Sequence, residues 1–291
     1  MSNVGVICFL ASYLVAFALE VTRLKRRTVT SRTVMMVFAV AGLFAHTWYL
    51  FERSRQTSLP PLLSSARDWL LVLAWLAVVL YLVLTLFDRD LAVGLFLLPL
   101  VLILILSTYL VSDVPSTELT AHRGWAMLHA SLLVFGIAGV LSGFVLSMMY
   151  LAQHRRLKRR QTLKTGLRLP NLEVLARLNR WTVILSIPLL TLGMATGVGL
   201  AIYSRTGPTP LSLRDPVVMV NGILWLVMVC FFVWLVQTKR PAGKQVAWLT
   251  LWAFGFLLVT LVGLQVLSGE GVPLLKSWHA QSVQQSPLSG G

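Results

Sequence analysis

Five histidines are the side chains of this 291-residue chain with the clearest capacity for chemistry. Imidazole ligates metal ions and haem iron, and it also moves protons near neutral pH. Trp125 and His129 follow His122 by three and seven residues, so the three side chains share one stripe wherever a helix extends that far. The spacing therefore predicts two imidazoles and a flat aromatic ring along one helix face. The complete set is His46, His122, His129, His154 and His279.

Several other kinds of active site lack the residues that they need. All ten acidic residues fall in loops or at the ends of apolar stretches, and no Lys or Arg lies in the middle of one. Ion-coupled carriers usually keep ionisable groups at depth in the membrane, so this pattern argues against ion-coupled transport. The chain has no Walker A, HExxH or GxSxG motif. Cys8 and Cys230 lie singly in apolar stretches and form neither a disulfide framework nor a CxxC motif.

The elements that must position the histidines are transmembrane helices. Hydrophobic residues make up 57% of the chain and charged residues 12%, whereas a soluble domain carries about 25% charged residues. Each span needs about 20 apolar residues. We therefore predict an all-α fold, a polytopic integral membrane bundle of about eight transmembrane helices. It forms a single domain over residues 1–279, and a disordered tail follows over 280–291. The predicted spans cover residues 3–19, 34–51, 69–87, 91–112, 125–152, 181–203, 216–236 and 246–268.

The distribution of basic residues predicts the orientation of these spans. The first span has no basic residue before it and a strongly basic stretch after it, which is the reverse of a cleaved signal peptide. Of the 25 Lys and Arg residues, 18 fall in the loops on one side of the predicted topology. Because cytoplasmic loops carry the excess of Lys and Arg, both termini are predicted to be extracytoplasmic. The expected location is the inner (plasma) membrane.

The longest predicted loop, residues 153–180, is cytoplasmic and basic. Asn171 is a suitable N-cap, and Glu173 lies in the first turn of the helix that would follow. Leucines then recur at helical spacing, so we predict a short interfacial helix that leads into the sixth span. Anionic lipid headgroups are the expected partners of the basic run, a regulatory protein is the alternative, and no nucleic-acid partner is expected.

This topology places four of the five histidines at or near the extracytoplasmic face. His46 lies near the outer end of the second span, His129 lies about one turn into the fifth, and His122 and His279 lie in the outer loop and tail. From the residues alone, two interpretations are open. The imidazoles ligate haem, or they hydrogen-bond between helices while tryptophans anchor the span ends. Arginines on the same side that can pair with haem propionates are Arg123, Arg205 and Arg214.

Several stretches, in a fixed order along the chain, carry a family resemblance. They are His46 with its aromatic followers, Gly94-Leu95-Phe96-Leu97-Leu98-Pro99, Trp125-Ala126-Met127-Leu128-His129, Met149-Tyr150-Leu151 before the basic run, Leu169-Pro170-Asn171-Leu172-Glu173, and Leu189 through Gly193 to Thr196-Gly197. Together they cover roughly residues 35–280. In this order they resemble the cytochrome c assembly protein family of the CcsA/CcmC type. The sequence looks closest to the eight-span HemX-like branch.

The resemblance implies a set of haem-binding residues. In that family, two extracytoplasmic histidines flank a tryptophan-rich (WWD) loop and ligate the haem iron. By position, His129 resembles the first and His279 the second, with His46 as a third haem contact. The resemblance adds Asp215 to the residues expected to bind the cofactor, haem b, and the spacing and topology had already proposed Trp125, Arg123 and Arg214 for it.

The tryptophan-rich loop is where this sequence departs from the family pattern. The Asp-Pro pair of the pattern is kept as Asp215-Pro216, and Trp225 matches a downstream tryptophan. The tryptophans before the aspartate and the charged residues after the proline are absent. The resemblance therefore implies the scaffold and the flanking histidines of the family, with a degenerate haem-presenting loop.

The leading functional hypothesis is a cytochrome c biogenesis protein that binds or hands over haem at the extracytoplasmic face. Its expected partners are haem, membrane lipids, a second cytochrome c assembly subunit and apocytochrome c. Any haem attachment would belong to a complex, because neither cysteine is placed to act. One alternative is a HemX-like accessory protein that regulates tetrapyrrole (haem) biosynthesis through its cytoplasmic loop without delivering haem. Another is a transporter or lipid-binding scaffold of unrelated function.

Overall fold

The architecture is that of a helical bundle, described here from a computed structural model. The structure describes residues 2–23, 29–87, 93–111, 123–158, 170–204, 216–238 and 242–269. Within these ranges it has helices and no strand. The helices are α1 (Ser2–Thr22), α2 (Val29–Thr57), α3 (Pro61–Ser64), α4 (Ala66–Phe87), α5 (Gly94–Ser107), α6 (Arg123–Lys158), α7 (Leu172–Ser204), α8 (Pro216–Gln237) and α9 (Gly243–Gly269).

The predicted fold class is confirmed, since each of the eight apolar stretches contains a helix. Within the described residues, five helices are long and apolar enough to cross a membrane, namely α1, α2, α4, α6 and α7, and the described parts of α5 and α8 are shorter apolar helices. The number of about eight spans stays a prediction. The tail predicted over 280–291 lies outside the described residues.

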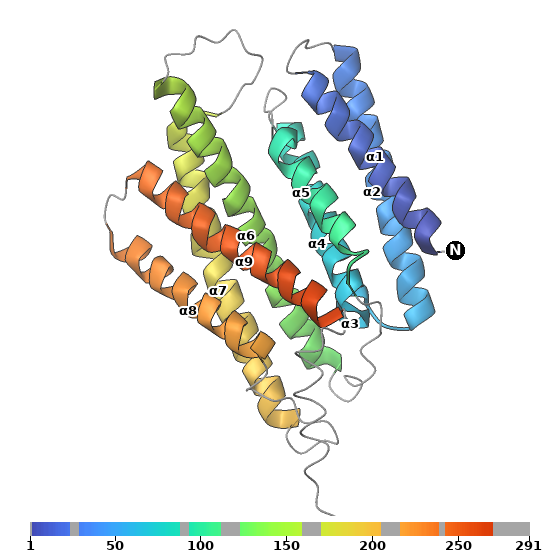
Figure 1. Ribbon diagram of the computed structural model, residues 1–291, viewed down its shortest axis with the longest axis vertical. Helices are drawn as coiled ribbons and strands as arrows, with labels where there is room; N and C mark the ends of the chain where they lie inside the picture. Colours follow the sequence, from blue (N-terminus) through green and yellow to red (C-terminus); the bar gives the residue numbers. More distant parts are fainter. Residues whose placement is uncertain are drawn as a thin grey trace, which may run out of the picture.

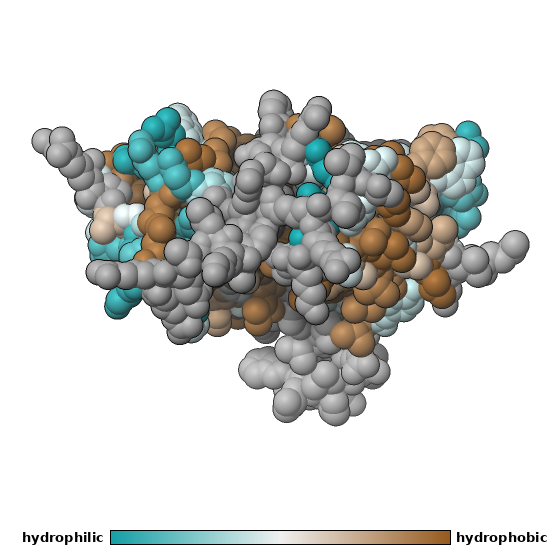
Figure 2. Space-filling model, turned by 90° about the horizontal axis from the view of Figure 1, so that it is seen from above, coloured by the Kyte–Doolittle hydropathy of each residue, from teal (hydrophilic) through white to brown (hydrophobic). Residues whose placement is uncertain are grey.

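The outer surface of the bundle carries large apolar side chains. Phe44, Trp252 and Val259 are each about 70% exposed, at 72%, 69% and 71%. Brown apolar side chains occupy much of the flanks in the end-on view of Figure 2. A soluble monomer rarely exposes apolar patches of this extent, so the flanks are suited to contact with lipid tails. The chain is accordingly a multi-pass membrane protein.

The helices fall into two groups in Figure 1, with α1, α2, α4 and α5 on one side and α6 to α9 on the other. Successive long helices alternate in direction, so α2 and α7 end, and α4 and α6 begin, at the end of the bundle where α3 lies. We call this the outer end, after the predicted topology. The opposite, inner end carries the basic residues of α6 (Arg155, Arg156 and Lys158).

Helices α6 and α7 are longer than the apolar stretches that predicted them. With 36 and 33 residues, they measure about 54 and 50 Å at 1.5 Å per residue, against a hydrocarbon core of about 30 Å. Asn171 caps α7 as predicted, because its side-chain Oδ1 accepts a hydrogen bond from the Val174 N–H at 2.8 Å. The helix expected in the basic loop is therefore the first part of α7 itself, and α6 extends into the loop as far as Lys158.

Small residues let α6 and α7 approach each other closely. A Cβ atom added at Gly136 would lie 2.8 Å from Cδ2 of Leu190, and one added at Gly193 would lie 2.7 Å from Cδ2 of Leu133. A Cβ atom at Gly139 would overlap the Ser186 hydroxyl. Close approach at such small residues is a common way for helices to associate in membranes.

A buried amide joins α6, α7 and α9 in the part of this helix group nearer the inner end. Asn179 accepts a hydrogen bond from the Ser147 hydroxyl at 3.3 Å and donates one to Thr250 Oγ1 at 3.3 Å. All three side chains are almost fully buried. Because each polar group finds a partner, the network adds interhelical hydrogen bonds without leaving an unsatisfied amide inside the bundle.

Candidate functional site

His129 lies in the seam between α6 and α7, six residues after α6 begins, which is about 9 Å along the helix. Its Nδ1 lies 2.8 Å from the carbonyl oxygen of Gly193 and 3.3 Å from Thr196 Oγ1. The ring is half-buried. The two bonded residues belong to α7, more than 60 positions along the chain, so the site exists only where these helices are packed together.

The bond to Gly193 selects one tautomer of the His129 ring. A carbonyl oxygen only accepts hydrogen bonds, so Nδ1 must carry the proton that it donates. The other nitrogen, Nε2, then keeps its lone pair. A histidine held through Nδ1–H to a backbone carbonyl, with Nε2 free to bind, is the usual arrangement of a metal-ligating imidazole.

Gly197 of α7 makes room for the His129 ring, whereas a side chain at Gly199 would only touch the ring of Trp125. A Cβ atom added at Gly197 would lie 2.7 Å from Cε1 of His129, and one added at Gly199 would lie 3.7 Å from Cζ2 of Trp125. The Trp125 indole N–H donates a hydrogen bond to the Thr196 carbonyl at 3.1 Å. The structure therefore brings Trp125 and His129 onto the same face of α6, both bonded to the same turn of α7.

The side of α6 next to His129 is covered by the short helix α3. Leu63 of α3 forms a small buried cluster with Ala126 and Ala130 of α6 and Leu200 of α7. Leu62 and Met127 pack against this cluster. Trp125 is 48% exposed, so the stripe that carries it keeps contact with the surroundings of the bundle. The His129 region thus has an apolar wall formed by α3 and α7 and a more open side at Trp125.

His46 lies in a different helix pair. Its fully buried ring stacks on Phe9 of α1, with ring centroids 4.2 Å apart and planes 2° apart. Its Nδ1 lies 3.4 Å from the Tyr13 hydroxyl, while Nε2 has no hydrogen-bond partner among the described residues. The polar and aromatic contacts of His46 are therefore with α1, whereas those of His129 are with α7. Packing places the two imidazoles in separate surroundings.

The remaining predicted site residues are not described at the level of their side chains. His279, Asp215 and Arg214 lie outside the described residues. Arg123 is the first residue of α6, and its side chain is likewise outside the description. The predicted roles of His279 and Asp215 rest on the family resemblance, and those of the two arginines rest on the predicted topology.

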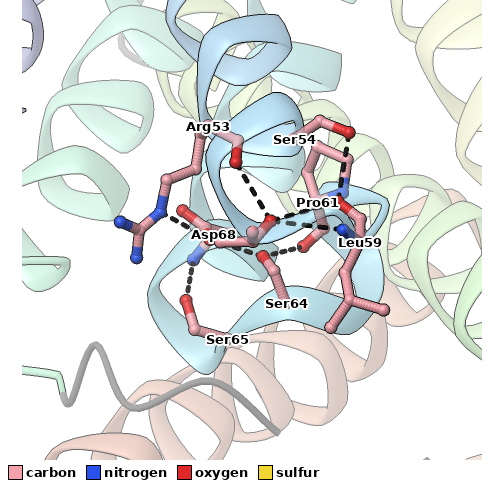
Figure 3. A network of polar contacts seen from close by, with 8 residues as sticks. Arg53, Ser54, Leu59, Pro61, Ser64, Ser65 and Asp68 are labelled. Carbon is pink, nitrogen blue, oxygen red and sulfur yellow. Dashed lines mark hydrogen bonds and ion pairs between the residues drawn. The ribbon is translucent and has the colours of Figure 1, made fainter. Parts of the chain in front are cut away.

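Sequence reasoning missed a buried ion pair at the outer end of the bundle. Figure 3 shows Asp68 of α4 enclosed by Arg53 of α2 and by Ser64 and Ser65. Arg53 Nε donates to Asp68 Oδ2 at 3.1 Å, and Asp68 is 0% exposed. The sequence placed this acid merely at the end of an apolar stretch. No local signal distinguishes it, because the partner arginine is 15 residues away on another helix.

The described part of the chain contains no cluster of side chains that could coordinate a bare metal ion. No three His, Cys, Asp or Glu side chains lie together there in a group that could hold one. A single imidazole with a free Nε2 instead suits the axial position of a metal whose remaining ligands come from a macrocycle, as in haem.

Comparison with known proteins found a family model that matches the larger part of the chain. A model of the family described as cytochrome c assembly protein matches residues 63–272. The matched segment contains Trp125, His129 and Asp215, and it excludes His46 and His279. No curated protein matches the chain, and no solved structure matches it.

Proposed function

This chain belongs to the cytochrome c assembly protein family, and on that premise we propose that it binds haem b at the outer end of its bundle with His129 as an axial ligand. The coarser role is cytochrome c biogenesis in a membrane. The finer proposal concerns the haem itself, which enters as the cargo of assembly. When bound, the haem supplies the iron porphyrin that is transferred during cytochrome c assembly.

The observation that carries this proposal is the hydrogen bond from His129 Nδ1–H to the Gly193 carbonyl. It orients the ring and leaves Nε2 as the group that can donate electrons to iron. Trp125, bonded to the same turn of α7, adds a flat aromatic surface of the kind that packs against a porphyrin. The protein's own residues therefore hold, orient and partly shield the ligand.

We propose the other haem contacts from the family resemblance and the predicted topology. His279 is the second axial ligand, Arg123 and Arg214 pair with the propionates, and Asp215 belongs to the remnant of the tryptophan-rich loop. His46 is a third haem contact only if the α1–α2 pair opens, because its ring is fully buried against Phe9. The proposed partners are a second cytochrome c assembly subunit and apocytochrome c, in the inner (plasma) membrane.

Haem binding is tested directly by the absorption spectrum of the full chain. Protein purified in detergent from haem-replete cells, or titrated with haemin, is expected to show a Soret band with the narrow visible bands of a low-spin iron on reduction. A colourless preparation that also fails to bind added haemin would contradict the proposal.

Replacing Gly197 by alanine tests the ring position without removing the ligand. The new Cβ atom would lie 2.7 Å from His129 Cε1, so the imidazole must shift away from its seat on α7. Disturbance of groups that orient a metal ligand typically costs 10- to 100-fold in affinity, and we expect haem affinity to fall by about tenfold. The measurement is haemin titration followed at the Soret band.

Gly222→Ala is the matched control for this variant. It makes the same chemical change in another apolar helix, but a Cβ atom there meets nothing within 4 Å. Equal haem affinity of the two variants would show that the packing of the His129 ring against Gly197 does not affect haem binding.

A regulatory role is the second candidate, and one observation favours it. Helix α6 continues past its apolar part and presents Arg155 and Lys158 to solvent at the inner end. A helical basic surface is suited to an acidic partner protein as well as to anionic lipid. In this reading the chain is a HemX-like accessory protein that controls tetrapyrrole biosynthesis.

Deleting residues 155–168 separates the two candidates. This segment lies in the predicted cytoplasmic loop and includes Arg155 and Lys158 at the inner end of α6. If the protein is regulatory, the deletion is expected to change the cellular level of tetrapyrrole intermediates at least about twofold while the purified protein's haem content is unchanged. Unaltered intermediates, measured by their fluorescence in cell extracts, would remove the regulatory reading.

A further inference from the structure

The buried ion pair at the outer end ties three elements of the chain together. Arg53 of α2 donates to Asp68 Oδ2, the Ser64 hydroxyl of α3 donates to the same oxygen, and the Asp68 backbone N–H donates to Ser65 Oγ at 3.1 Å. Figure 3 shows these groups converging on Asp68. Because Asp68 Oδ1 is buried with no hydrogen-bond partner among the described residues, the carboxylate depends on Arg53 and Ser64 for compensation of its buried charge.

Helix α3 is too short to hold its own position. It has four residues, far fewer than an isolated helix needs in order to persist. At one end it is held by Ser64 through Asp68. Just before its start, the Ser54 and Thr57 hydroxyls of α2 donate to the Leu59 carbonyl at 3.1 and 3.3 Å. The placement of α3 is therefore set by polar bonds to its neighbours, and Asp68 lies at the centre of them.

The apolar side of α3 faces the helix that carries His129. Leu63 is 8% exposed and is buried with Ala126 and Ala130, which lie three residues before and one residue after His129. Leu200 in the same cluster follows the Gly193–Gly197 stretch of α7 that seats the imidazole. Leu63 thus packs on α6 at the level of the candidate site, in a cluster that also includes Leu200 of α7.

Contact between the two helix groups is incomplete deeper in the bundle. An apolar groove of about 280 Å³, open on one side, lies between α4 and α6 and is lined by Leu73, Leu76 and Leu80 on one side and by Ala138 and Ser142 on the other. At the outer end, the α3 cluster joins the two groups through Leu63 and the alanines of α6.

We propose that Asp68 is a positioning residue, which holds α3 as a wall of the His129 site and so sets the surroundings of the bound haem. This inference rests on the proposed function. The acid itself need not contact haem, since its effect passes through Ser64 and Leu63 to α6.

Two measurements on Asp68→Asn test the inference. In a chain with Cys8 and Cys230 changed to serine, a cysteine placed by Leu63→Cys reports whether α3 stays packed. Its labelling by a membrane-permeant maleimide is expected to be at least about tenfold faster with Asp68→Asn than without it. In the otherwise native chain, Asp68→Asn is expected to shift the low-spin g values of the ferric haem. Glu52→Gln is the control, because Glu52 is an exposed acid on α2 that bonds only to Gln56 among the described residues, and it should change neither signal.

Two further variants keep the test decisive if Asp68→Asn fails to fold. Ser64→Ala removes one bond to Asp68 but leaves the ion pair with Arg53, and Leu63→Ala removes the wall itself. Each is expected to shift the same haem signal. Unchanged g values in Leu63→Ala, or unchanged maleimide labelling in Asp68→Asn and Ser64→Ala, would overturn the inference while leaving haem binding established. Absence of any haem spectrum in the native chain would instead mark failure of the proposed function, and the inference would fall with it.

Discussion

Replacing His129 by alanine is expected to remove most of the haem bound by the purified chain. The variant loses the Nε2 lone pair that the bond to Gly193 leaves free, and with it one axial bond to iron. Changes that only disturb the support of a metal ligand cost 10- to 100-fold in affinity, so loss of the ligand itself should exceed about 100-fold. The measurement is haem stoichiometry from the pyridine haemochrome spectrum, together with haemin titration.

His154→Ala is the matched control, since it makes the same substitution in the same helix. His154 lies near the inner end of α6 and stacks on Tyr150, with ring centroids 6.3 Å apart. The His154→Ala variant should bind haem with the same affinity as the native chain. If His129→Ala kept its haem while remaining folded, His129 would be an interhelical hydrogen-bonding residue and the axial ligand would have to be sought elsewhere.

Replacing Gly136 by leucine is expected to separate α6 from α7 and to destabilise the fold. Even the first added carbon would lie 2.8 Å from the Leu190 side chain and 3.2 Å from the Leu190 backbone nitrogen. The side chain can turn away, but the backbone of α7 can give way only by moving as a whole. Overpacking of this kind costs about 1–3 kcal/mol, which a titration with SDS followed by circular dichroism would measure.

Gly222→Leu controls for the change in helix propensity and in apolar surface. Position 222 offers open space within 4 Å for a Cβ atom, so this variant should unfold like the native chain. The Gly136 variant has a second expected effect. The same seam seats His129 on Gly193 and Gly197 one or two turns further out, so haem affinity should fall together with stability. Loss of stability with native haem affinity would mean that the outer end of the seam packs independently of its middle.

Helix existence and direction were predictable because they follow from local properties. A backbone in a bilayer must satisfy its own hydrogen bonds, so an apolar stretch of sufficient length becomes a helix whatever its neighbours are. Helix ends were less predictable. Helices α6 and α7 continue through Arg155 and Arg177 beyond their apolar stretches, because a helix in water needs only compatible residues and a cap, such as the one that Asn171 provides.

The candidate site was predictable only in part. The sequence placed His129 near the outer end of a span and aligned it with Trp125, since depth and helical face depend on residue counting. It could not pair His129 with Gly193 or show that His46 is buried against Phe9 in another helix pair. The relative rotation and neighbours of helices depend on close packing at positions such as Gly136, Gly193 and Gly197, where the contacts join residues more than 50 positions apart.

Asp68 illustrates the same division between composition and packing. Read as a sequence position, it is an acid at the end of an apolar stretch, where solvent is expected. Packing buries it completely beside Arg53 and places its carboxylate within hydrogen-bonding distance of Ser64 on α3. The sequence by itself determined a basic, membrane-spanning helical bundle of the cytochrome c assembly family, with imidazoles near one end. Only the tertiary structure decided which imidazole lies half-buried against α7, which is fully buried against α1, and which acid is buried. All three depend on contacts between helices and not on the residues within any one of them.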